Sequence, residues 1–289
     1  MTVTIDFLVP GFSKCGTTTL CALIEQHPQL YIPEIKETWY FSSKKYESKR
    51  EEFEQHFAPA IKGQLLGEGS VSYSGYEHES LVIPRIKINN PECKFIFIAR
   101  NPLERIESSY REMHHSGVLF GLNAPFSLHE NLQTFPQMVQ DSCFYARISK
   151  YVQAFGDDSI LVLFLEDLRS HPEVELKRCF RHLGVDEQVK VDTEVRLNDG
   201  SSKLYDTRLL RYFRTHRWFG PRLARLSPVH QDRILIPTGL RRRFRGSVEW
   251  DDKAIEMVRE RVVPDSRDFL QAYGKPPGFW DMQFKTGCA

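Results

Sequence analysis

The sequence has no apolar run approaching the ~20 residues that a membrane-spanning helix needs. No basic, then apolar, then small-residue signal precedes Ile5, so we expect a cytoplasmic protein. Net charge is almost absent too, with 39 Lys and Arg against 38 Asp and Glu. Because a nearly neutral chain has no long-range electrostatic attraction to a polyanion, we expect neither a nucleic-acid nor a membrane partner.

Clustered cysteine is also lacking. The six cysteines form no CxxC pair and no Cys/His cluster, so we expect no zinc and no other metal. Without a secretory signal, free thiols in a reducing cytosol are the default. The composition is otherwise that of a globular protein, with 41% hydrophobic and 27% charged residues.

The most informative stretch is an apolar run ending at Pro10, a loop bounded by Gly11 and Gly16, and helical apolar spacing from Thr17 onward. This order predicts a strand, a turn and a helix N-terminus. The N–H groups of a first helical turn have no intrahelical partner, and the helix dipole adds partial positive charge there. The loop is therefore predicted to bind a phosphate group.

The residues expected to make this site are Lys14, Cys15, Gly16, Thr17, Thr18 and Thr19. Some of the threonines could instead cap the helix. Cys15 is either a thiol with a lowered pKa near the helix N-terminus or a small residue that fits a tight loop. Gly11 and Gly16 have the separation of a nucleotide P-loop, but Thr17 stands where that loop has lysine, which weakens a kinase interpretation.

Buried strands are predicted at 64–70, 94–99 and 160–165, alternating with helices. This alternation predicts a three-layer α/β fold with a parallel sheet, in one domain over 1–289. Such sheets bind ligands at the carboxyl ends of their strands. Helices are expected at 50–57, 81–88, from Leu103, at 144–155, 173–183 and 254–270 with an interruption at Pro264, and 116–140 is expected to be irregular or partly helical.

A basic, partly helical C-terminal part, 203–289, is expected to pack on this domain. Residues 203–245 hold twelve Lys and Arg against two acids. They form either a solvated face whose arginine stems cover apolar surface or a site for an anionic ligand or partner.

Three motifs together resemble the sulfotransferases that use 3′-phosphoadenosine 5′-phosphosulfate (PAPS). The loop at Phe7 to Leu20 resembles the family's 5′-phosphosulfate loop, and Arg100 to Tyr110 matches its 3′-phosphate motif, Arg-x-Pro-x-x-Arg-x-x-Ser-x-Tyr. Lys36 to Phe41 resembles a segment of the branch that includes heparan sulfate sulfotransferases and many bacterial enzymes. The resemblance implies a P-loop-like sulfotransferase fold and PAPS as the sulfonate donor.

The resemblance also implies roles for individual residues. Lys14 would contact the oxygen that bridges phosphate and sulfonate, Arg100 and Ser108 would grip the 3′-phosphate, and Glu37 would be the catalytic base. Two alternatives remain open: a structural salt bridge for Arg100, and an ion pair with Lys36 for Glu37. Arg105 is as well suited to an internal ion pair.

Further residues are assigned more loosely. His114 and His115 are rival bases or walls of the substrate pocket, for which Trp39 and Tyr73 are also candidates. The stretch from Asn198 to Lys203 resembles the family's nucleotide-covering loop, which would place Ser202 or Lys203 near the phosphates.

One departure bears on the acceptor. Gly69 stands where the heparan-type enzymes have lysine, and Val71 stands where they have proline. This disfavours a sulfated glycan and favours a small-molecule acceptor of natural-product metabolism. The competing interpretations are a sulfotransferase acting on a glycan, a non-catalytic binding protein, and a kinase, whose Mg²⁺ only Glu166 and Asp167 could hold. The oligomeric state is left open.

Overall fold

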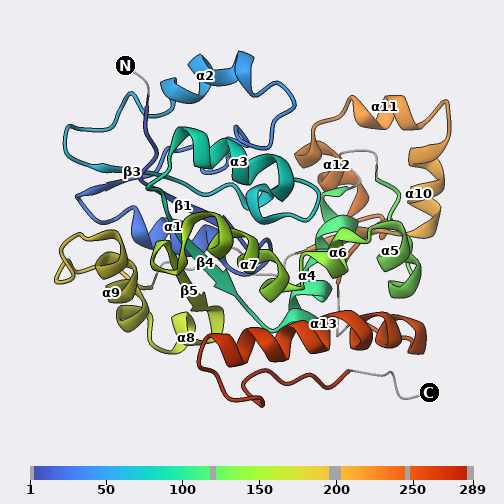
Figure 1. Cartoon of the computed structure of the whole chain (residues 1–289). Helices are drawn as coiled ribbons and strands as arrows, with labels where there is room; N and C mark the ends of the chain where they lie inside the picture. Colours follow the sequence, from blue (N-terminus) through green and yellow to red (C-terminus); the bar gives the residue numbers. More distant parts are fainter. Residues whose placement is uncertain (1–2, 118–121, 195–202, 245–247, 285–289) are drawn as a thin grey trace. The chain divides into compact units, whose positions relative to one another are not determined.

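The computed structural model describes residues 3–117, 122–194, 203–244 and 248–284. Five parallel strands form the main sheet in the order β2-β3-β1-β4-β5 (Figure 1). They are β1 (Phe7–Gly11), β2 (Leu30–Tyr31), β3 (Leu65–Glu68), β4 (Lys94–Ala99) and β5 (Ile160–Phe164). The predicted α/β fold with a parallel sheet is confirmed.

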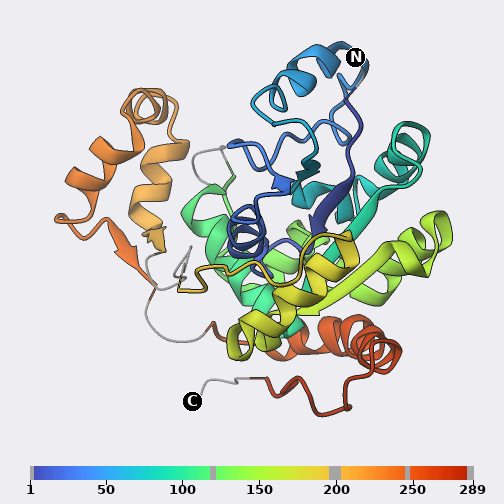
Figure 2. The ribbon, with the colours of Figure 1, turned by 90° about the vertical axis from the view of Figure 1, so that its left-hand side faces the viewer.

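Helices cover both faces of this sheet. Helices α1 (Thr17–Ile24) and α9 (Pro172–Leu183) lie side by side on one face, as Figure 2 shows in dark blue and yellow. Helices α3 (Glu79–Asn89) and α7 (Phe144–Phe155) contact each other on the opposite face. All five residues of β1 are buried, as expected of a strand covered on both sides.

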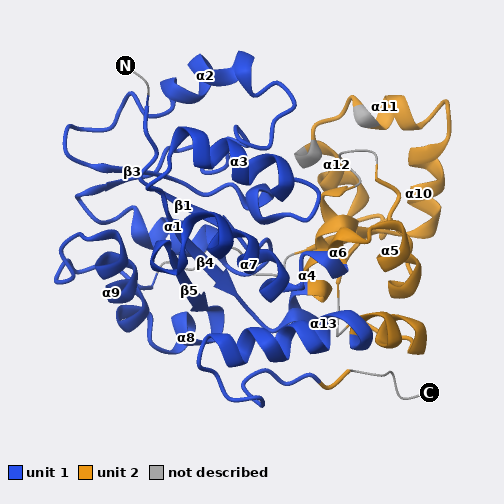
Figure 3. Ribbon diagram, in the orientation of Figure 1, with its two compact units in different colours: residues 1–105, 139–198, 259–282 blue, residues 106–138, 199–258, 283–289 orange. Residues whose placement is uncertain are grey.

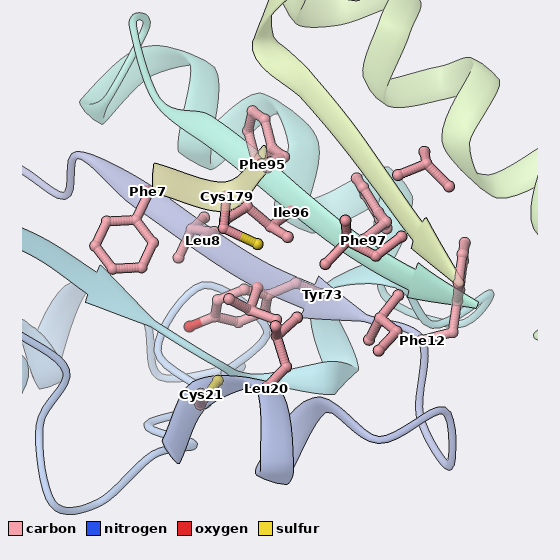
Figure 4. Packing of buried hydrophobic residues seen from close by; sticks show 14 of the residues in the cluster. Phe7, Leu8, Phe12, Leu20, Cys21, Tyr73, Phe95, Ile96, Phe97 and Cys179 are labelled. Atoms are coloured by element: carbon pink, nitrogen blue, oxygen red, sulfur yellow. The ribbon is translucent and has the colours of Figure 1, made fainter. Parts of the chain in front are cut away.

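Aromatic packing fixes the end of β1, where the loop begins (Figure 4). The Phe12 ring centroid lies 5.4 Å from that of Phe97 and 4.4 Å from that of Phe144. Tyr151 on α7 packs edge-on against Phe95 and Phe97, at 5.1 Å from each. The loop therefore starts from a residue held in the core between the sheet and α7, which limits how far its backbone can shift.

The chain divides into two compact units (Figure 3). Unit 1 comprises residues 1–105, 139–198 and 259–282, and unit 2 comprises 106–138, 199–258 and 283–289. Helices α4 (Pro102–His115) and α13 (Asp252–Ala272) each run from one unit into the other. The single domain expected over 1–289 stays a prediction.

The remaining elements are short. They are the 3₁₀ helices η1 (Glu47–Lys49), η2 (Val71–Ser74) and η4 (Asp157–Ser159), the helices α2 (Arg50–Gln55), α5 (Leu128–Thr134), α6 (Gln137–Gln140), α8 (Leu165–Ser170), α10 (Arg208–Thr215), α11 (Gly220–Ala224) and α12 (Pro228–Leu235), and the antiparallel strands β6 (Leu204–Asp206) and β7 (Arg241–Arg243).

The expected interruption at Pro264 is wrong, because α13 runs through it from Asp252 to Ala272. Proline removes one hydrogen bond and crowds the preceding turn. The buried side of the helix nevertheless continues past this residue, with Val262, Ser266 and Phe269 all buried. Burial of this continuous face keeps the helix in one piece.

Candidate active site

The loop between β1 and α1 is a tight turn that requires glycine at position 16. Gly16 has φ 95° and ψ 16°, in the left-handed region that favours glycine. A Cβ there would also lie 2.7 Å from Leu165 Cδ1, which is closer than real Cβ contacts come. The Cys15 N–H donates to the Phe12 carbonyl at 3.1 Å and closes the turn. The backbone conformation therefore requires glycine at this position, and an added Cβ would also displace the Leu165 side chain.

The N-terminus of α1 carries no side-chain cap. Gly16 is its N-cap residue, and Thr17 to Thr19 form its first turn. The first backbone bond of the helix runs from the Leu20 N–H to the Gly16 carbonyl at 3.0 Å. The alternative that one of these threonines caps the helix is therefore wrong. An uncapped N-terminus at the end of a sheet is the arrangement that binds anions in proteins.

Two residues near this loop have strained backbones. Among the described residues, Lys14 (φ 66°) and Trp39 (φ 51°) are the non-glycine residues with positive φ. This conformation disfavours residues that carry a Cβ, and such strain tends to collect at functional sites. Both residues were also predicted site residues, Lys14 at the leaving oxygen and Trp39 in the acceptor pocket.

Cys15 is a buried thiol. Desolvation raises its pKa to about 12, and the nearby charges of Arg105 and Arg100 offset only part of this effect. A lowered pKa is therefore wrong, and the side chain behaves as the small residue of a tight loop. A contact between its backbone and a phosphate stays a prediction.

The Lys36–Phe41 segment lies against the start of α1. The Lys36 ammonium donates to Glu37 Oε1 at 2.8 Å and to the Thr17 hydroxyl at 3.4 Å. The indole N–H of Trp39 donates to Glu37 Oε2 at 3.1 Å. The ion pair that was the alternative for Glu37 is thus present, and it places this carboxylate beside the anion loop. Trp39 is 56% exposed, as a pocket wall requires.

Glu68, at the end of β3, holds this segment in place. Its carboxylate is fully buried and accepts hydrogen bonds from the Thr38 N–H at 3.0 Å, the Tyr73 hydroxyl at 3.1 Å and the Ser70 and Thr38 hydroxyls. Burial raises the pKa of this carboxyl, and the hydrogen bonds from Ser70 and Thr38 counter that rise. Glu68 was not among the predicted site residues, although an acidic residue at the end of a buried strand is a signal that can be read from the sequence.

Tyr73 is fully buried, with its hydroxyl directed at Glu68. Its ring presents no surface to a ligand in this structure, and the substrate-pocket role stays a prediction.

Arg100 follows β4 and touches the loop. One guanidinium nitrogen donates to the Lys14 carbonyl at 3.4 Å, and another pairs with the Glu104 carboxylate. The structural salt bridge considered for Arg100 is thus present. Its Nε is buried, with no hydrogen-bond partner among the described residues. A buried cationic donor left without a partner is a group that an anionic ligand would satisfy.

The other members of the predicted set are less closely tied to the loop. Arg105 makes the expected internal ion pair, at 3.4 Å to Asp141. Ser108 lies on the part of α4 that belongs to unit 2. Lys203 pairs with Glu112 at 2.7 Å within unit 2. Ser202 and the rest of the expected covering loop, 198–202, lie outside the described residues.

The two histidines are held by arginines of unit 2. His114 is buried beside the Arg211 guanidinium, and desolvation, reinforced by that charge, lowers the His114 pKa to about 3. The His115 Nδ1 accepts from the Leu204 N–H at 3.1 Å, and burial lowers the His115 pKa too. A base with a pKa near 3 takes a proton poorly at neutral pH, so His114 is poorly suited to be the base.

We predict that His114 makes stability depend on pH. Its folded-state pKa of about 3 lies below the ordinary 6.5, so its contribution is complete above pH 6.5 and is lost as the pH falls. The free energy of unfolding should fall by up to about 1.4 kcal/mol per pH unit for this one proton. His114→Gln should have a flatter urea-unfolding profile than wild type between pH 6.5 and about 5. Asp265, whose pKa is raised to about 6 by burial, titrates in the same range in both proteins and cancels in the comparison. The exposed His171→Gln is the control, and equal slopes for His114→Gln and wild type would contradict the assignment.

The acidic residues that a kinase would need are already engaged. Glu166 Oε1 accepts from the Asn101 N–H at 2.8 Å, and Asp167 pairs with Lys275 at 2.6 Å. One oxygen of each carboxylate is therefore held by a protein donor, while Glu166 Oε2 is buried with no hydrogen-bond partner among the described residues. The kinase alternative is tested by the ligand titration described below.

Fold and site together define a class of protein: a parallel α/β sheet whose first strand leads, through a tight loop, into an uncapped helix N-terminus. The sulfotransferase domain family matches residues 4–202, more than half of the chain. The chain belongs to this family.

Individual relatives are more distant. The membrane-associated sulfotransferase kil1 of Dictyostelium discoideum is 33% identical over 108 residues, covering 36% of this chain and 22% of that protein. The chain thus matches about a fifth of this curated relative's length. A solved sulfotransferase from Alicyclobacillus acidocaldarius has a TM-score of 0.56 at 22% identity, over 80% of this chain and 97% of that one. At that identity the likeness shows the fold.

Proposed function

We propose that the protein transfers the sulfonate group of PAPS to a hydroxyl or amine of a small acceptor. The proposal rests on one observation: Lys36 connects the anion loop to the candidate base. Its ammonium donates hydrogen bonds both to Thr17, at the start of α1, and to Glu37. A donor site and an acceptor site that share one lysine suit the transfer of an anionic group between them.

On the donor side, the first turn of α1 and Lys14 hold the 5′ end of the nucleotide. PAPS supplies the sulfonate, attached through an oxygen to the 5′-phosphate. Negative charge grows on that oxygen as its bond to sulfur breaks. We assign the Lys14 ammonium to this oxygen, because stabilising charge that develops in the transition state is commonly the largest catalytic contribution.

On the acceptor side, Glu37 takes the proton. Its carboxylate is 27% exposed, so an acceptor can reach it, and both of its oxygens are oriented by neighbours. As the acceptor oxygen or nitrogen bonds to sulfur, its proton passes to Glu37. The Lys36 ammonium stays beside the transferred group and helps to balance its charge.

Glu68 and its partners position this base. The backbone N–H of Thr38 donates to the Glu68 carboxylate, and the backbone N–H of Trp39 donates to the Ser70 hydroxyl at 2.9 Å. Both bonds tie the residues directly after Glu37 to the end of β3. The loop that carries the base is therefore anchored to the end of a strand, which restricts the movement of Glu37.

We predict that Arg100→Ala chiefly weakens nucleotide binding. A charge-assisted contact to the 3′-phosphate is worth roughly 1.5–3 kcal/mol, or about one to two decades in affinity. Calorimetric titration with the desulfonated nucleotide measures the loss. The control is a nucleotide that lacks the 3′-phosphate, on which variant and wild type should be nearly equal. An equal loss on both ligands would assign Arg100 to the loop instead.

Gly69 bears on the acceptor class. A Cβ at this position would lie 2.8 Å from Cys21 Sγ and 3.0 Å from Lys36 Cε. The Cys21 thiol and the stem of Lys36 therefore occupy the space where another side chain would begin, and a lysine at position 69 would require them to shift. With one lysine rather than two at this point, the site is less suited to a polyanionic glycan. This supports the proposed small-molecule acceptor. We infer natural-product metabolism as its setting only from the family resemblance.

The proposed setting is the cytoplasm. Among the described residues, no helix is long and apolar enough to cross a membrane.

One experiment separates sulfotransferase from kinase. The purified protein is titrated by calorimetry with the desulfonated nucleotide and with ATP, each with and without a chelator. We expect tight binding of the first, unaffected by the chelator, and weak binding of ATP. Mg²⁺-dependent binding of ATP alone would overturn the proposal in favour of a kinase.

A further inference from the structure

The most concentrated positive charge in the sequence falls in unit 2, in a segment that supplies few of the candidate active-site residues. We call the described residues 203–244 the arginine-rich lobe. It contains β6, α10, α11, α12 and β7, drawn in orange in Figure 2. Its sequence carries eleven Lys and Arg against two acids, while the whole chain is nearly neutral. The proposed sulfonate transfer uses no described residue of the lobe except, by resemblance, Lys203.

The two acidic residues of the lobe form ion pairs with arginines of the same lobe. Asp206 is fully buried and pairs with Arg214 and with Arg241. Asp232 pairs with Arg241 at 2.7 Å. Seven further arginines are exposed and make no ion pair with a described acidic side chain: Arg208, Arg217, Arg222, Arg225, Arg233, Arg242 and Arg243. The lobe therefore presents a strong uncompensated positive charge to solvent.

Exposed apolar side chains gather on the same lobe. Sixteen large hydrophobic residues are exposed in the described chain, and seven of them fall between Leu209 and Ile236. These are Leu209 (55%), Tyr212 (63%), Trp218 (56%), Phe219 (52%), Leu226 (42%), Ile234 (55%) and Ile236 (43%). Single exposed hydrophobic residues are ordinary, but so many in one short stretch indicate an interaction surface.

Helix α10 shows how the two kinds of residue are combined. Leu210 and Arg211 are buried, so this side of the helix packs into the unit. Arg208, Leu209 and Tyr212 are exposed on the other side, because residues three and four apart share a helix face. An ordinary surface helix turns its polar side outward, whereas α10 turns outward leucine and tyrosine flanked by arginine. Beyond it, the Arg217 guanidinium lies 5.3 Å from the centre of the exposed Trp218 ring.

We propose that the arginine-rich lobe docks on the surface of an anionic phospholipid bilayer. Arginine with tryptophan, tyrosine and aliphatic residues is the composition of interfacial segments that enter the headgroup region. The guanidinium groups pair with lipid phosphates while Trp218, Ile234 and their neighbours reach the acyl boundary. The protein lies on the membrane and does not span it. This departs from the expectation of no membrane partner. That expectation rests on the net charge of the whole chain and does not consider the positive charge concentrated in the lobe.

Other occupants fit the same surface less well. A nucleic acid or an anionic glycan would engage the arginines and the aromatic rings but would leave Leu209, Leu226, Ile234 and Ile236 without apolar partners. A second copy of the chain would bring two surfaces of the same sign together, which is costly. Of these occupants, a lipid surface matches both the charge and the aliphatic side chains.

The test uses the full-length protein and two kinds of vesicle. One is made of phosphatidylcholine alone and the other of phosphatidylcholine with phosphatidylglycerol. We expect the protein to sediment with the anionic vesicles, less so at high salt, and to remain in solution with the neutral ones. Tryptophan fluorescence should shift to shorter wavelength on binding. Trp218→Phe should still sediment but lose most of that shift, which identifies the lobe as the surface in contact.

Two pairs of variants separate the contributions. Arg222→Gln with Arg225→Gln should weaken vesicle binding about thirty-fold, since each basic residue near the surface contributes a factor of about five. The matched control, Arg169→Gln with Lys177→Gln, removes the same charge from exposed positions of unit 1 and should change little. Ile234→Ser with Trp218→Ala should weaken binding at least about tenfold. Ile61→Ser with Ile88→Ser, which alters side chains 68% and 81% exposed, is its control and should bind like wild type.

Four outcomes would overturn the proposal: no binding to either vesicle, equal losses in variants and controls, the full fluorescence shift retained in Trp218→Phe, or binding to single-stranded RNA or to a second copy in place of vesicles. Thermal unfolding of each variant shows that the lobe is still folded. None of the altered residues belongs to the candidate active site, so nucleotide titration should be unchanged throughout. A failed vesicle test therefore leaves the proposed sulfonate transfer standing.

Discussion

Glu37→Gln is expected to lower the turnover of sulfonate transfer by about 10²–10⁴-fold, the usual cost of removing a general base. Glutamine keeps the size of the side chain but cannot take the acceptor proton. Its single carbonyl oxygen can replace Oε1, which accepts from Lys36, or Oε2, which accepts from the Trp39 indole, but not both. Nucleotide affinity should be nearly unchanged, because the contacts assigned to the nucleotide lie on Lys14, Arg100 and the first turn of α1. Steady-state kinetics and calorimetry on the same preparation measure the two quantities.

The matched control is Glu34→Gln, an exposed glutamate three residues earlier in the chain. It should retain full activity. Near-normal turnover in Glu37→Gln together with an inactive His115→Ala would move the base role to histidine. If Glu37→Gln instead loses nucleotide affinity, its carboxylate serves to orient Lys36 against Thr17 and is not the base.

Lys14→Met is expected to have the second large effect, a loss of about 10²–10³-fold in turnover, by analogy with removing one preorganised donor from a developing oxyanion. Methionine keeps the unbranched stem, so the backbone at φ 66° is not made worse by branching at Cβ. The loss should appear mainly in turnover, because the charge on the leaving oxygen is small before the bond to sulfur breaks.

Comparing two rates sharpens this test. Lys44→Met alters an exposed lysine and should leave the rate unchanged. A donor whose 5′ leaving group is intrinsically better should lose less on Lys14→Met than PAPS does, since less charge needs stabilising. Equal losses with both donors would show that Lys14 binds the ground state and not the leaving oxygen.

The sheet and the loop could be predicted from sequence because their signals are local. Residues 95–99 form a continuous apolar run, and Gly11 and Gly16 mark the two ends of the turn that follows β1. Helix α7 matches the expected 144–155 because its apolar residues recur at helical spacing up to the stop at Gly156. The two-stranded β6–β7 sheet was not predicted, since three consecutive arginines carry no strand signal.

The site was less predictable, because its decisive contacts join distant segments. Lys36 and Thr17 are hydrogen-bonded although they lie 19 positions apart, and Thr38 and Glu68 lie 30 positions apart. Contacts at such separations produce no periodic pattern in the sequence. The motifs identified Lys14, Glu37 and Arg100 as individual residues. They could not show that Glu68 supports the Lys36–Phe41 segment or that Gly69 makes room for the stem of Lys36.

The left-handed backbone at Lys14 and Trp39 has a consequence for protein engineering. Glycine adopts this conformation without the Cβ clash, so a glycine at either position relieves a native-state cost of roughly 1–2 kcal/mol, although the more flexible unfolded chain gives part of it back. A library ranked by melting temperature should therefore tolerate, and can even enrich, substitutions that discard the lysine and the indole. The same library ranked by turnover should reject them. Thermostabilised descendants of this chain would need both positions held constant by design.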